Sequence, residues 1–274
     1  MKRTAVIGLG IIGASLARTL KGRGLCVDGY DLQTETLSYA LDNGYIDGIA
    51  DQLAEYDNVF LAVPPNATIS ILQNAVFKSG AFVADICGVK EDIEKAVYAK
   101  PRNYRYVGLH PMAGKETSGI KSSSATLFSG ANLVITIASN MDLSALEEAR
   151  EFSRLLGFGK IVECTAEEHD KKIALTSQLA HIVSNAYVKS SQVPHCDGFT
   201  GGSFQDMTRI AGVDEHMWTE LYMRNRNHIL TEIRGLIDNL SVYERAIAEG
   251  DEDGLRRALA EGKAIRRKIK RKND

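Results

Sequence analysis

The sequence is poor in the features that mark secreted, membrane-bound or nucleic-acid-binding proteins. Its four cysteines are scattered without CxxC spacing, as expected in a reducing compartment. No apolar run approaches the ~18 residues that a membrane-spanning helix needs, and the N-terminal MKRTAVIGLG has no signal-like apolar core. The formal net charge of −2 gives no reason to expect nucleic acid or an anionic membrane as a partner. We therefore expect a cytoplasmic protein that acts on a small molecule.

The N-terminal segment predicts a dinucleotide-binding fold. The apolar run TAVIG is typical of a buried strand, GLGIIG follows it, and ASLARTLKGRG has helical spacing. Gly8 allows the tight turn, Gly10 lets the backbone approach a pyrophosphate, and Gly13 lets helix and strand pack closely. Ile11 and Ile12 stand at the helix start, where free N–H groups face the anion. A purely structural glycine turn is the alternative.

Asp31 supports the nucleotide hypothesis and indicates the cofactor. It ends a second predicted strand, LCVDGYD, and follows Gly13 at close to the ~20-residue offset at which an acidic side chain meets the adenosine ribose. Its carboxylate would accept hydrogen bonds from a free 2′-hydroxyl and repel a 2′-phosphate. The sequence therefore predicts NAD rather than NADP.

Further strand-like segments, separated by stretches with helical spacing, extend the α/β pattern. They are NVFLAV (58–63), AFVAD (81–85), YRYVG (104–108), ANLVITIA (131–138) and KIVEC (160–164). Val63, Pro64 and Pro65 come at a carboxyl edge, where a doubly wound sheet binds its ligand, and should shape the cofactor floor. Pro111 is expected to end the third of these strands. We expect an α/β, Rossmann-like NAD-binding domain over residues 1–164.

The second half of the chain predicts helices only. Thr165 and Glu168 have the spacing of a capping box, and no strand signal follows them. Apolar residues recur at helical spacing between residues 214 and 250, and such a stripe would most simply pair with a second copy of the chain. The basic segment GKAIRRKIKRKND, which has no aromatic residues, is typical of a solvated helix end. We expect an all-helical substrate and dimerisation domain over residues 165–274, and a homodimer.

His110, in GLHPMAGKETSG, is the first candidate for chemistry. It is the one side chain of that segment that exchanges a proton near neutral pH. A hydride-transfer site needs a group that takes the substrate's proton, and a neutral imidazole with an ordinary pKa suits that task. A turnover rate that rises with pH through about 6 to 7 is then expected. The alternative is a polar loop residue that follows a strand.

Four segments together resemble the prephenate/arogenate dehydrogenase family. They are HPMAGKE after the Rossmann-like half, SQLAHIVS on a helix, GGSFQDMTRIA, and MW. HPMAG together with DMTRIA is much more specific than a Rossmann fingerprint. The resemblance implies NAD-dependent oxidative decarboxylation of prephenate to 4-hydroxyphenylpyruvate, in tyrosine biosynthesis, without a metal. Arogenate dehydrogenase, which converts arogenate to tyrosine, is the alternative.

The same resemblance implies roles for individual residues. His110 would accept a hydrogen bond or proton from the ring 4-hydroxyl, Arg209 would bind the ring carboxylate, and His181 would be a second substrate-side histidine. Further substrate-binding positions are Lys115, Glu116, Gly202, Gln205 and Asp206, of which Gly202 matches a glycine supplied by the partner subunit. From the residues alone, His181 could instead be hydrogen-bonded between packed helices. Arg209 could likewise pair with Asp206 at a helix end.

The chain departs from the family pattern at Gly88. Many members have a serine or threonine there that touches both the catalytic histidine and the nicotinamide, whereas this chain reads DICGVK. Gly88 should still border the cofactor, but a water or the Cys87 thiol would have to orient His110. Two alternatives therefore stay open. One is a catalytically silent NAD-binding sensor, and the other is a β-hydroxyacid dehydrogenase, which usually relies on a lysine in its helical domain.

Overall fold

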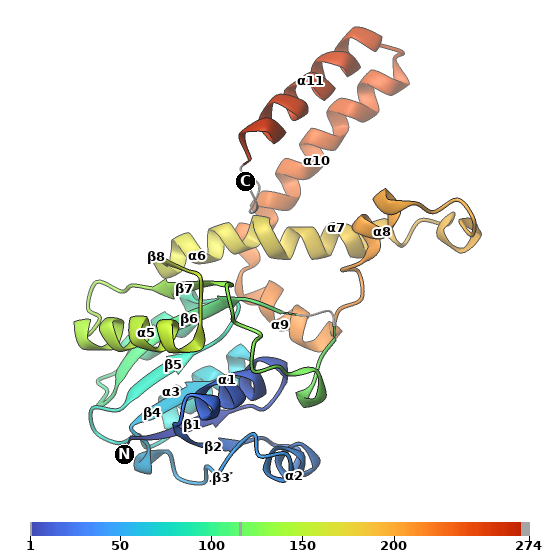
Figure 1. The fold of residues 1–274 in the computed structure, drawn as a ribbon. Helices are drawn as coiled ribbons and strands as arrows, with labels where there is room; N and C mark the ends of the chain where they lie inside the picture. Colours follow the sequence, from blue (N-terminus) through green and yellow to red (C-terminus); the bar gives the residue numbers. More distant parts are fainter. Residues whose placement is uncertain (1, 115–116, 270–274) are drawn as a thin grey trace. The chain divides into compact units, whose positions relative to one another are not determined.

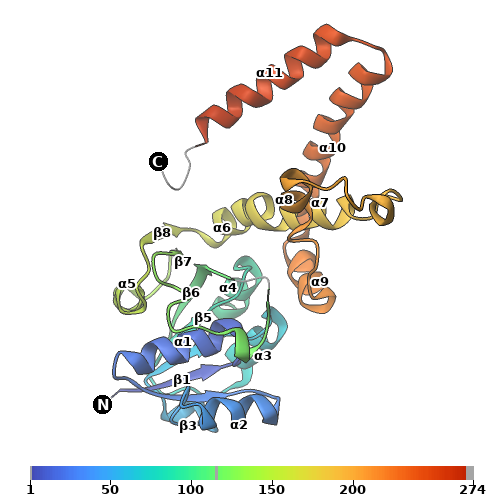
Figure 2. The same cartoon turned by 45° about the vertical axis from the view of Figure 1, so that its right-hand side comes forward.

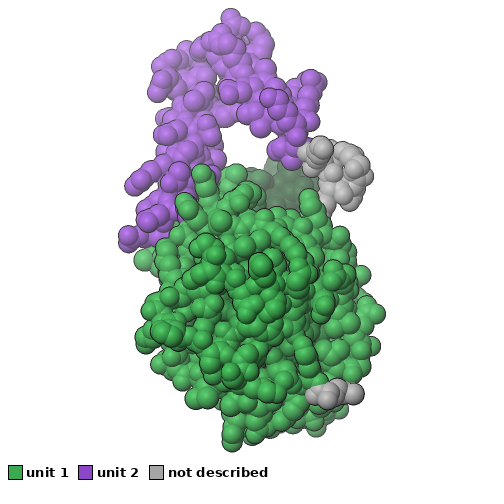
Figure 3. Space-filling model, turned by 90° about the vertical axis from the view of Figure 1, so that its left-hand side faces the viewer, with its two compact units in different colours: residues 1–225 green, residues 226–274 purple. Residues whose placement is uncertain are grey.

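The computed structural model describes residues 2–114 and 117–269. The chain divides into two compact units, Met1–Asn225 and Arg226–Asp274 (Figure 3). The larger unit holds the sheet and the first helices that follow it, and the smaller unit is a pair of helices. This division after Asn225 differs from the domain boundary that the sequence predicts after Cys164. The boundary after Cys164 stays a prediction.

Unit 1 is built on a mostly parallel sheet (Figure 1). In the described residues the strand order is β3-β2-β1-β4-β5-β6-β7-β8, and only β6 and β7 pair antiparallel. The strands are β1 Arg3–Ile7, β2 Cys26–Tyr30, β3 Gly48–Ile49, β4 Asn58–Leu61, β5 Phe82–Asp85, β6 Arg105–Met112, β7 Asn132–Thr136 and β8 Lys160–Cys164. The predicted strands are present, and β3 is an addition. The order reverses between β1 and β4, and in such sheets a crevice for ligand opens at the carboxyl ends there.

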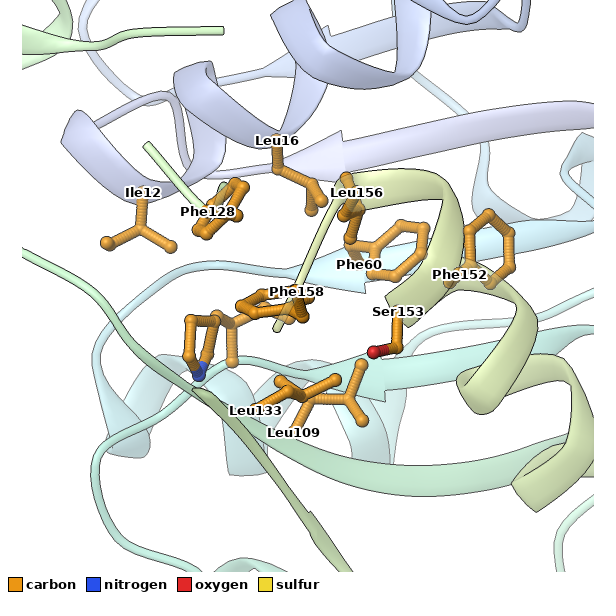
Figure 4. Close-up of a pocket in the computed structure, with 12 residues that line it drawn as sticks. Ile12, Leu16, Phe60, Leu109, Phe128, Leu133, Phe152, Ser153, Leu156 and Phe158 are labelled. Carbon is orange, nitrogen blue, oxygen red and sulfur yellow. The ribbon is translucent and has the colours of Figure 1, made fainter. Parts of the chain in front are cut away.

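Helices cover both faces of the sheet, because each face is apolar. On one face lie α1 (Ile11–Gly22), α2 (Thr34–Asp42) and α5 (Leu143–Leu156), and on the other lie α3 (Pro65–Asn74) and α4 (Glu91–Tyr98). The core on the α1 and α5 side encloses an apolar cavity of about 10 Å³ (Figure 4). That volume holds at most one water, so this cavity is a packing seam and not a cofactor site.

Pro111 does not end β6, contrary to the sequence expectation. The strand continues through His110 and Pro111 to Met112, and Pro111 pairs with Leu133 of β7. β5 ends opposite Gly108, so the residues beyond it are paired on one side only. A proline without an N–H is tolerated at such an edge. His110 therefore stands on a strand, past the carboxyl end of β5, and not in a loop.

Beyond β8, unit 1 continues as helices (Figures 1 and 2). Thr165 caps the first of them by accepting a hydrogen bond from the Glu168 N–H at 3.1 Å, as the capping-box spacing predicted. The order is α6 Ala166–Ile173, a π-helical stretch Ala174–Leu179, α7 Ala180–Tyr187, α8 Gly202–Thr208 and α9 Glu215–Arg224.

Unit 2 consists of α10 (Arg226–Ala248) and α11 (Glu252–Lys268). The helices form a hairpin in which Asp251 caps α11 by accepting from the Gly254 N–H. Apolar side chains remain exposed along both helices, among them Ile237, Leu240, Val242, Ile247, Leu259 and Ile265. No helix in the described part of the chain is long and apolar enough to cross a membrane.

A buried ion pair lies near the carboxyl edge of the sheet. Lys90 Nζ is 2.5 Å from Asp85 Oδ1, and both side chains are fully buried. Asp85 also accepts from the Tyr106 hydroxyl at 2.6 Å, and Lys90 donates to the Leu109 carbonyl at 2.7 Å. The pair thus fixes β5 to β6 immediately before His110.

Replacing Lys90 with methionine should destabilise the fold strongly, because it leaves the Asp85 carboxylate buried without its cation. Breaking a buried pair in this way costs about 3–5 kcal/mol. Urea denaturation of the Lys90→Met variant measures the loss. Lys172→Met, which breaks the exposed Lys172–Glu168 pair, is the matched control and should unfold like the parent. A Lys90→Met protein as stable as that control would contradict the prediction.

Candidate functional site

The glycine loop after β1 has the geometry that a dinucleotide requires. Gly8 has a φ of +91°, and a Cβ there would lie 2.4 Å from the Ala62 carbonyl oxygen. A Cβ on Gly13 would lie 1.8 Å from the Gly8 carbonyl oxygen, so helix α1 and the loop are in close contact. At Gly10 no heavy atom lies within 4 Å of the Cβ position, so this side of the loop is open. The first N–H groups of α1, with Ile11 and Ile12, face that opening without a side-chain cap.

A large cavity adjoins the loop at the carboxyl ends of the first three strands. It has a volume of about 620 Å³, and Ile7, Tyr30 and Ala50, which end or follow β1, β2 and β3, line it together with Ile71 of α3. Its position at the reversal of strand order and its size fit the adenosine half of a dinucleotide.

Asp31 stands at the rim, next after Tyr30. Its carboxylate accepts from the Leu9 N–H at 2.8 Å and from the Gln33 N–H at 3.0 Å, which fixes its orientation. Each carboxylate oxygen can accept more than one bond, so capacity remains for ribose hydroxyls.

The Val63–Pro64–Pro65 turn after β4 lies against the glycine loop. A Cβ on Gly8 would meet Val63 Cγ1 at 2.7 Å. Pro64 is the N-cap of α3 and Pro65 its first residue, a position that does not need an N–H. The predicted cofactor floor is therefore placed beside the predicted pyrophosphate loop.

His110, which is half-buried, is the first member of a hydrogen-bonded series of side chains that continues into the buried His169 and Asp170. Its Nδ1 lies 2.8 Å from Nε2 of His169, and Nδ1 of His169 lies 2.6 Å from Oδ1 of Asp170. The Asp170 carboxylate also accepts, at 2.9 Å each, from the backbone N–H groups of Lys90 and Glu91 where α4 begins.

These hydrogen bonds determine which nitrogen of each histidine ring, His110 and His169, carries the proton. A carboxylate only accepts, so His169 must donate through Nδ1, and its neutral ring then accepts at Nε2. His110 therefore donates through Nδ1, which leaves its Nε2 with a free lone pair. The arrangement presents His110 Nε2 as a hydrogen-bond acceptor or base.

The pKa values of both histidines favour the neutral rings. Burial, together with the neighbouring His169 and the Lys90 cation, lowers the pKa of His110 well below 6.5. Burial also lowers the pKa of His169, although its hydrogen bond to Asp170 acts in the opposite direction. A charged ring would be poorly solvated there, so His110 is a neutral base across the physiological range.

The free Nε2 of His110 lies beside Gly88, which Leu221 of helix α9 also approaches. A Cβ on Gly88 would lie 3.8 Å from His110 Nε2 and 3.6 Å from Cδ2 of Leu221. Trp218 stands one turn earlier on the same face of α9, and its ring centroid is 4.0 Å from that of His181. One face of α9 therefore contacts His181 and also approaches Gly88, the neighbour of His110. Trp218 is partly buried.

Polar contacts hold α9 against the nucleotide-binding part of unit 1. Glu220 accepts from the backbone N–H of Asn66 in the first turn of α3, and Arg224 donates to the side chain of Asn66. Arg224 also donates to Asp92 of α4 at 3.2 Å. These contacts join α9 to the starts of α3 and α4, the two helices that begin near the predicted cofactor.

The predicted substrate side is assembled from α7 and α8. His181 Nδ1 donates to the Ile210 carbonyl at 2.9 Å. Burial and the nearby Arg209 cation lower the pKa of His181, although its hydrogen bond to Ile210 acts in the opposite direction. Gly202, Gln205, Asp206 and Arg209 are exposed on or next to α8. Lys115 and Glu116 lie outside the described residues.

Sequence reasoning missed His169, Asp170 and Lys90. His169 is only 2% exposed and contacts His110. One signal was available, since the Thr165 cap fixes the helix start and so places His169 in its first turns. Its partner, however, is 59 residues away in sequence.

Comparison with known families gives a match to almost the whole chain. The model described as prephenate dehydrogenase, nucleotide-binding domain, matches residues 16–162, and the model described as prephenate dehydrogenase, dimerization domain, matches residues 165–261. The chain belongs to the prephenate dehydrogenase family. The predicted resemblance is thus confirmed, as are the Rossmann-like domain followed by helices and the oxidoreductase class.

Relatives of the chain include enzymes that are named for different substrates. Cyclohexadienyl dehydrogenase of Zymomonas mobilis is 29% identical over 100% of this chain and 98% of that protein. Prephenate dehydrogenase of Lactococcus lactis is 30% identical over 97% of this chain and 77% of that protein.

Solved structures of the family superpose closely on the chain. Prephenate dehydrogenase from A. aeolicus, in complex with hydroxyphenyl propionate and NAD+, has a TM-score of 0.85 and 28% identity over 98% of this chain and 99% of that one. Synechocystis arogenate dehydrogenase has a TM-score of 0.77 and 25% identity over 97% and 99%.

The pKa of His110 leads to a revised pH dependence. Because that pKa lies well below 6.5, the base stays neutral as the pH falls to about 6, and turnover should be flat from about pH 6 to 8. A decline should begin only at lower pH. Turnover measured against pH, with His110→Asn as the inactive control, checks this. A midpoint between about 6.5 and 7.5 would contradict it and restore the value expected for an ordinary histidine.

Serine at position 88 should raise turnover. The Cβ has ordinary contacts there, and the added hydroxyl can reach the His110 ring. A hydrogen bond worth about 0.5–1.5 kcal/mol corresponds to roughly a two- to twelvefold rate change. Gly88→Ala, which adds the same Cβ without the hydroxyl, is the matched control. If Gly88→Ser and Gly88→Ala have equal turnover rates, the hydroxyl has no role.

Proposed function

We propose that this protein oxidises and decarboxylates prephenate to 4-hydroxyphenylpyruvate with NAD, a step of tyrosine biosynthesis. The observation that carries the proposal is the free Nε2 of His110, which is held through His169 and Asp170 next to the cofactor edge of the sheet. Family membership supports the reaction class, and the glycine loop with Asp31 supports the cofactor. The predicted cytoplasmic location stays a prediction.

In this proposal His110 acts on the hydroxyl at C4 of the substrate ring. Its neutral Nε2 accepts the hydroxyl hydrogen bond or proton while the hydride leaves C4. NAD supplies the hydride acceptor when bound. Leu221 packs beside Gly88 and limits water at this point, which strengthens the hydrogen bond. Loss of the ring carboxylate as carbon dioxide then completes the aromatic ring, without a metal.

The substrate carboxylates are bound, in this proposal, from the α7 and α8 side. Arg209 forms a bidentate pair with the ring carboxylate, and His181 offers Nε2, because its Nδ1 is bonded to the Ile210 carbonyl. Further substrate-binding residues, as the family resemblance implies, are Lys115, Glu116, Gln205 and Asp206. Gly202 comes from the partner of a homodimer, formed through the helical part that matches the family's dimerization domain.

An absorbance assay of NADH formation tests the function. The wild-type protein is given prephenate and arogenate separately, each with NAD and with NADP. The proposal expects turnover with prephenate and NAD, and a loss of about a hundredfold or more in His110→Asn. A preference for arogenate would identify an arogenate dehydrogenase. Turnover with neither substrate, despite NAD binding, would favour a silent sensor.

Asp31→Asn should relax the preference for NAD over NADP. The amide keeps the shape and an oxygen that can accept from Leu9 N–H, but it removes the charge that repels a 2′-phosphate. We expect the ratio of kcat/KM for NAD to that for NADP to fall by about tenfold or more, equivalent to roughly 1.4 kcal/mol. Steady-state kinetics with both cofactors measure the ratio. An unchanged ratio would assign the discrimination to other residues.

A further inference from the structure

The helices α6 and α7 form one continuous rod with a π-helical stretch, Ala174–Leu179, between them (Figures 1 and 2). His169 and Asp170 stand before this stretch and His181 stands after it. A π-turn closes with one more residue than an α-turn, and such insertions occur mostly at functional sites.

The extra residue changes which way the two histidines project. In an unbroken α-helix at 3.6 residues per turn, the twelve positions from His169 to His181 would place them about 120° apart around the axis. With one residue absorbed by the π-turn, the angle falls to about 20°. The π-turn therefore brings the partner of His110 and the substrate-side histidine to nearly the same side of the rod.

Asn225 bridges this turn. Its Nδ2 donates to the Asp170 carbonyl at 2.8 Å and to Oε1 of Gln178 at 2.6 Å. Asp170 precedes the π-helical stretch and Gln178 lies within it, so one amide spans the place where the helix changes pitch. The Asp170 carbonyl also accepts from the Ala174 N–H, which makes it a shared acceptor.

The bridge is not a simple stabilising contact. Asn225 and Gln178 are each 2% exposed. Among the described residues, Oδ1 of Asn225 and Nε2 of Gln178 are buried without a hydrogen-bond partner. Burying such groups lowers stability, so the pair calls for another explanation.

Asn225 is linked to the proposed active site in two ways. Asn225 fixes the backbone of Asp170, whose carboxylate ends the hydrogen-bonded chain from His110. It is also the C-cap of α9, the helix that places Trp218 beside His181 and Leu221 beside Gly88. Asn225 therefore connects the continuous helix α6–α7 to the end of α9.

We propose that Asn225 is a positioning residue, which holds the π-turn so that the His110–His169–Asp170 chain and His181 face the same substrate. The proposal rests on the proposed function, because that function gives both histidines one substrate. It assigns to Asn225 no contact with substrate or cofactor.

Two variants test the role through kinetics. Asn225→Ala removes the amide, and Asn225→Asp keeps its shape but loses the donor. Both should lower kcat for prephenate by about tenfold or more, while the Kd for NAD changes less than about twofold. Asn58→Ala, which removes another buried asparagine far along the sheet, is the matched control. It should lower Tm without a comparable loss of kcat. If Asn225→Asp keeps kcat, or loses kcat only in step with Tm as Asn58→Ala does, the proposal is overturned.

A second readout does not depend on activity. Long-range ¹H–¹⁵N NMR of the histidine rings reports the tautomers of His110 and His169. Asn225→Asp should alter these signals and Asn58→Ala should leave them unchanged. If the wild-type protein turns over neither prephenate nor arogenate, the proposed function fails and the ring signals still decide this inference. Unaltered ring signals in Asn225→Asp overturn it whatever the activity.

Discussion

The orientation of His110, the proposed base, depends on one buried carboxylate, that of Asp170. Two backbone N–H groups at the start of α4 hold it, at the positive end of a helix dipole. Because it is fixed, it can only accept from His169, and this in turn decides which nitrogen of His110 stays free. The same hydrogen bonds join α6 to α4. The helical segment after the sheet is therefore attached to the sheet domain at Asp170, the residue that orients His169 and through it His110.

A second charge acts on His110 through the backbone. Lys90, neutralised by Asp85, donates to the carbonyl of Leu109, the residue before the base. A buried ion pair is weak evidence for net stability, since desolvation offsets most of its attraction. Here it has a directional effect, because it fixes a strand end that has lost one neighbour. The ring is thus held through Nδ1 by His169 and through its own strand by Lys90.

The local patterns were predictable from sequence, and the long-range ones were not. The glycine loop and the Thr165 cap follow from spacings of a few residues, which the backbone geometry dictates. Pro111 was expected to end a strand. The strand can include this proline because β5 ends opposite Gly108, and that register cannot be read from the local sequence. His169 meets His110 only through the fold. The end of α9 at Arg224 has no clear sequence signal either, because RNRN contains no glycine or proline.

The absence of a hydroxyl at Gly88 is consistent with the way His169 and Lys90 hold His110. A hydroxyl at this position would add a further contact to a ring that is already oriented. Here the orientation comes from the opposite nitrogen, and the apolar Leu221 approaches Gly88. An apolar side chain there lowers the local dielectric constant, which makes a hydrogen bond from the substrate stronger. The polar contacts of α9 with α3 and α4 keep Leu221 in place. The environment of the base is therefore determined by how α9 docks as well as by the residue at position 88.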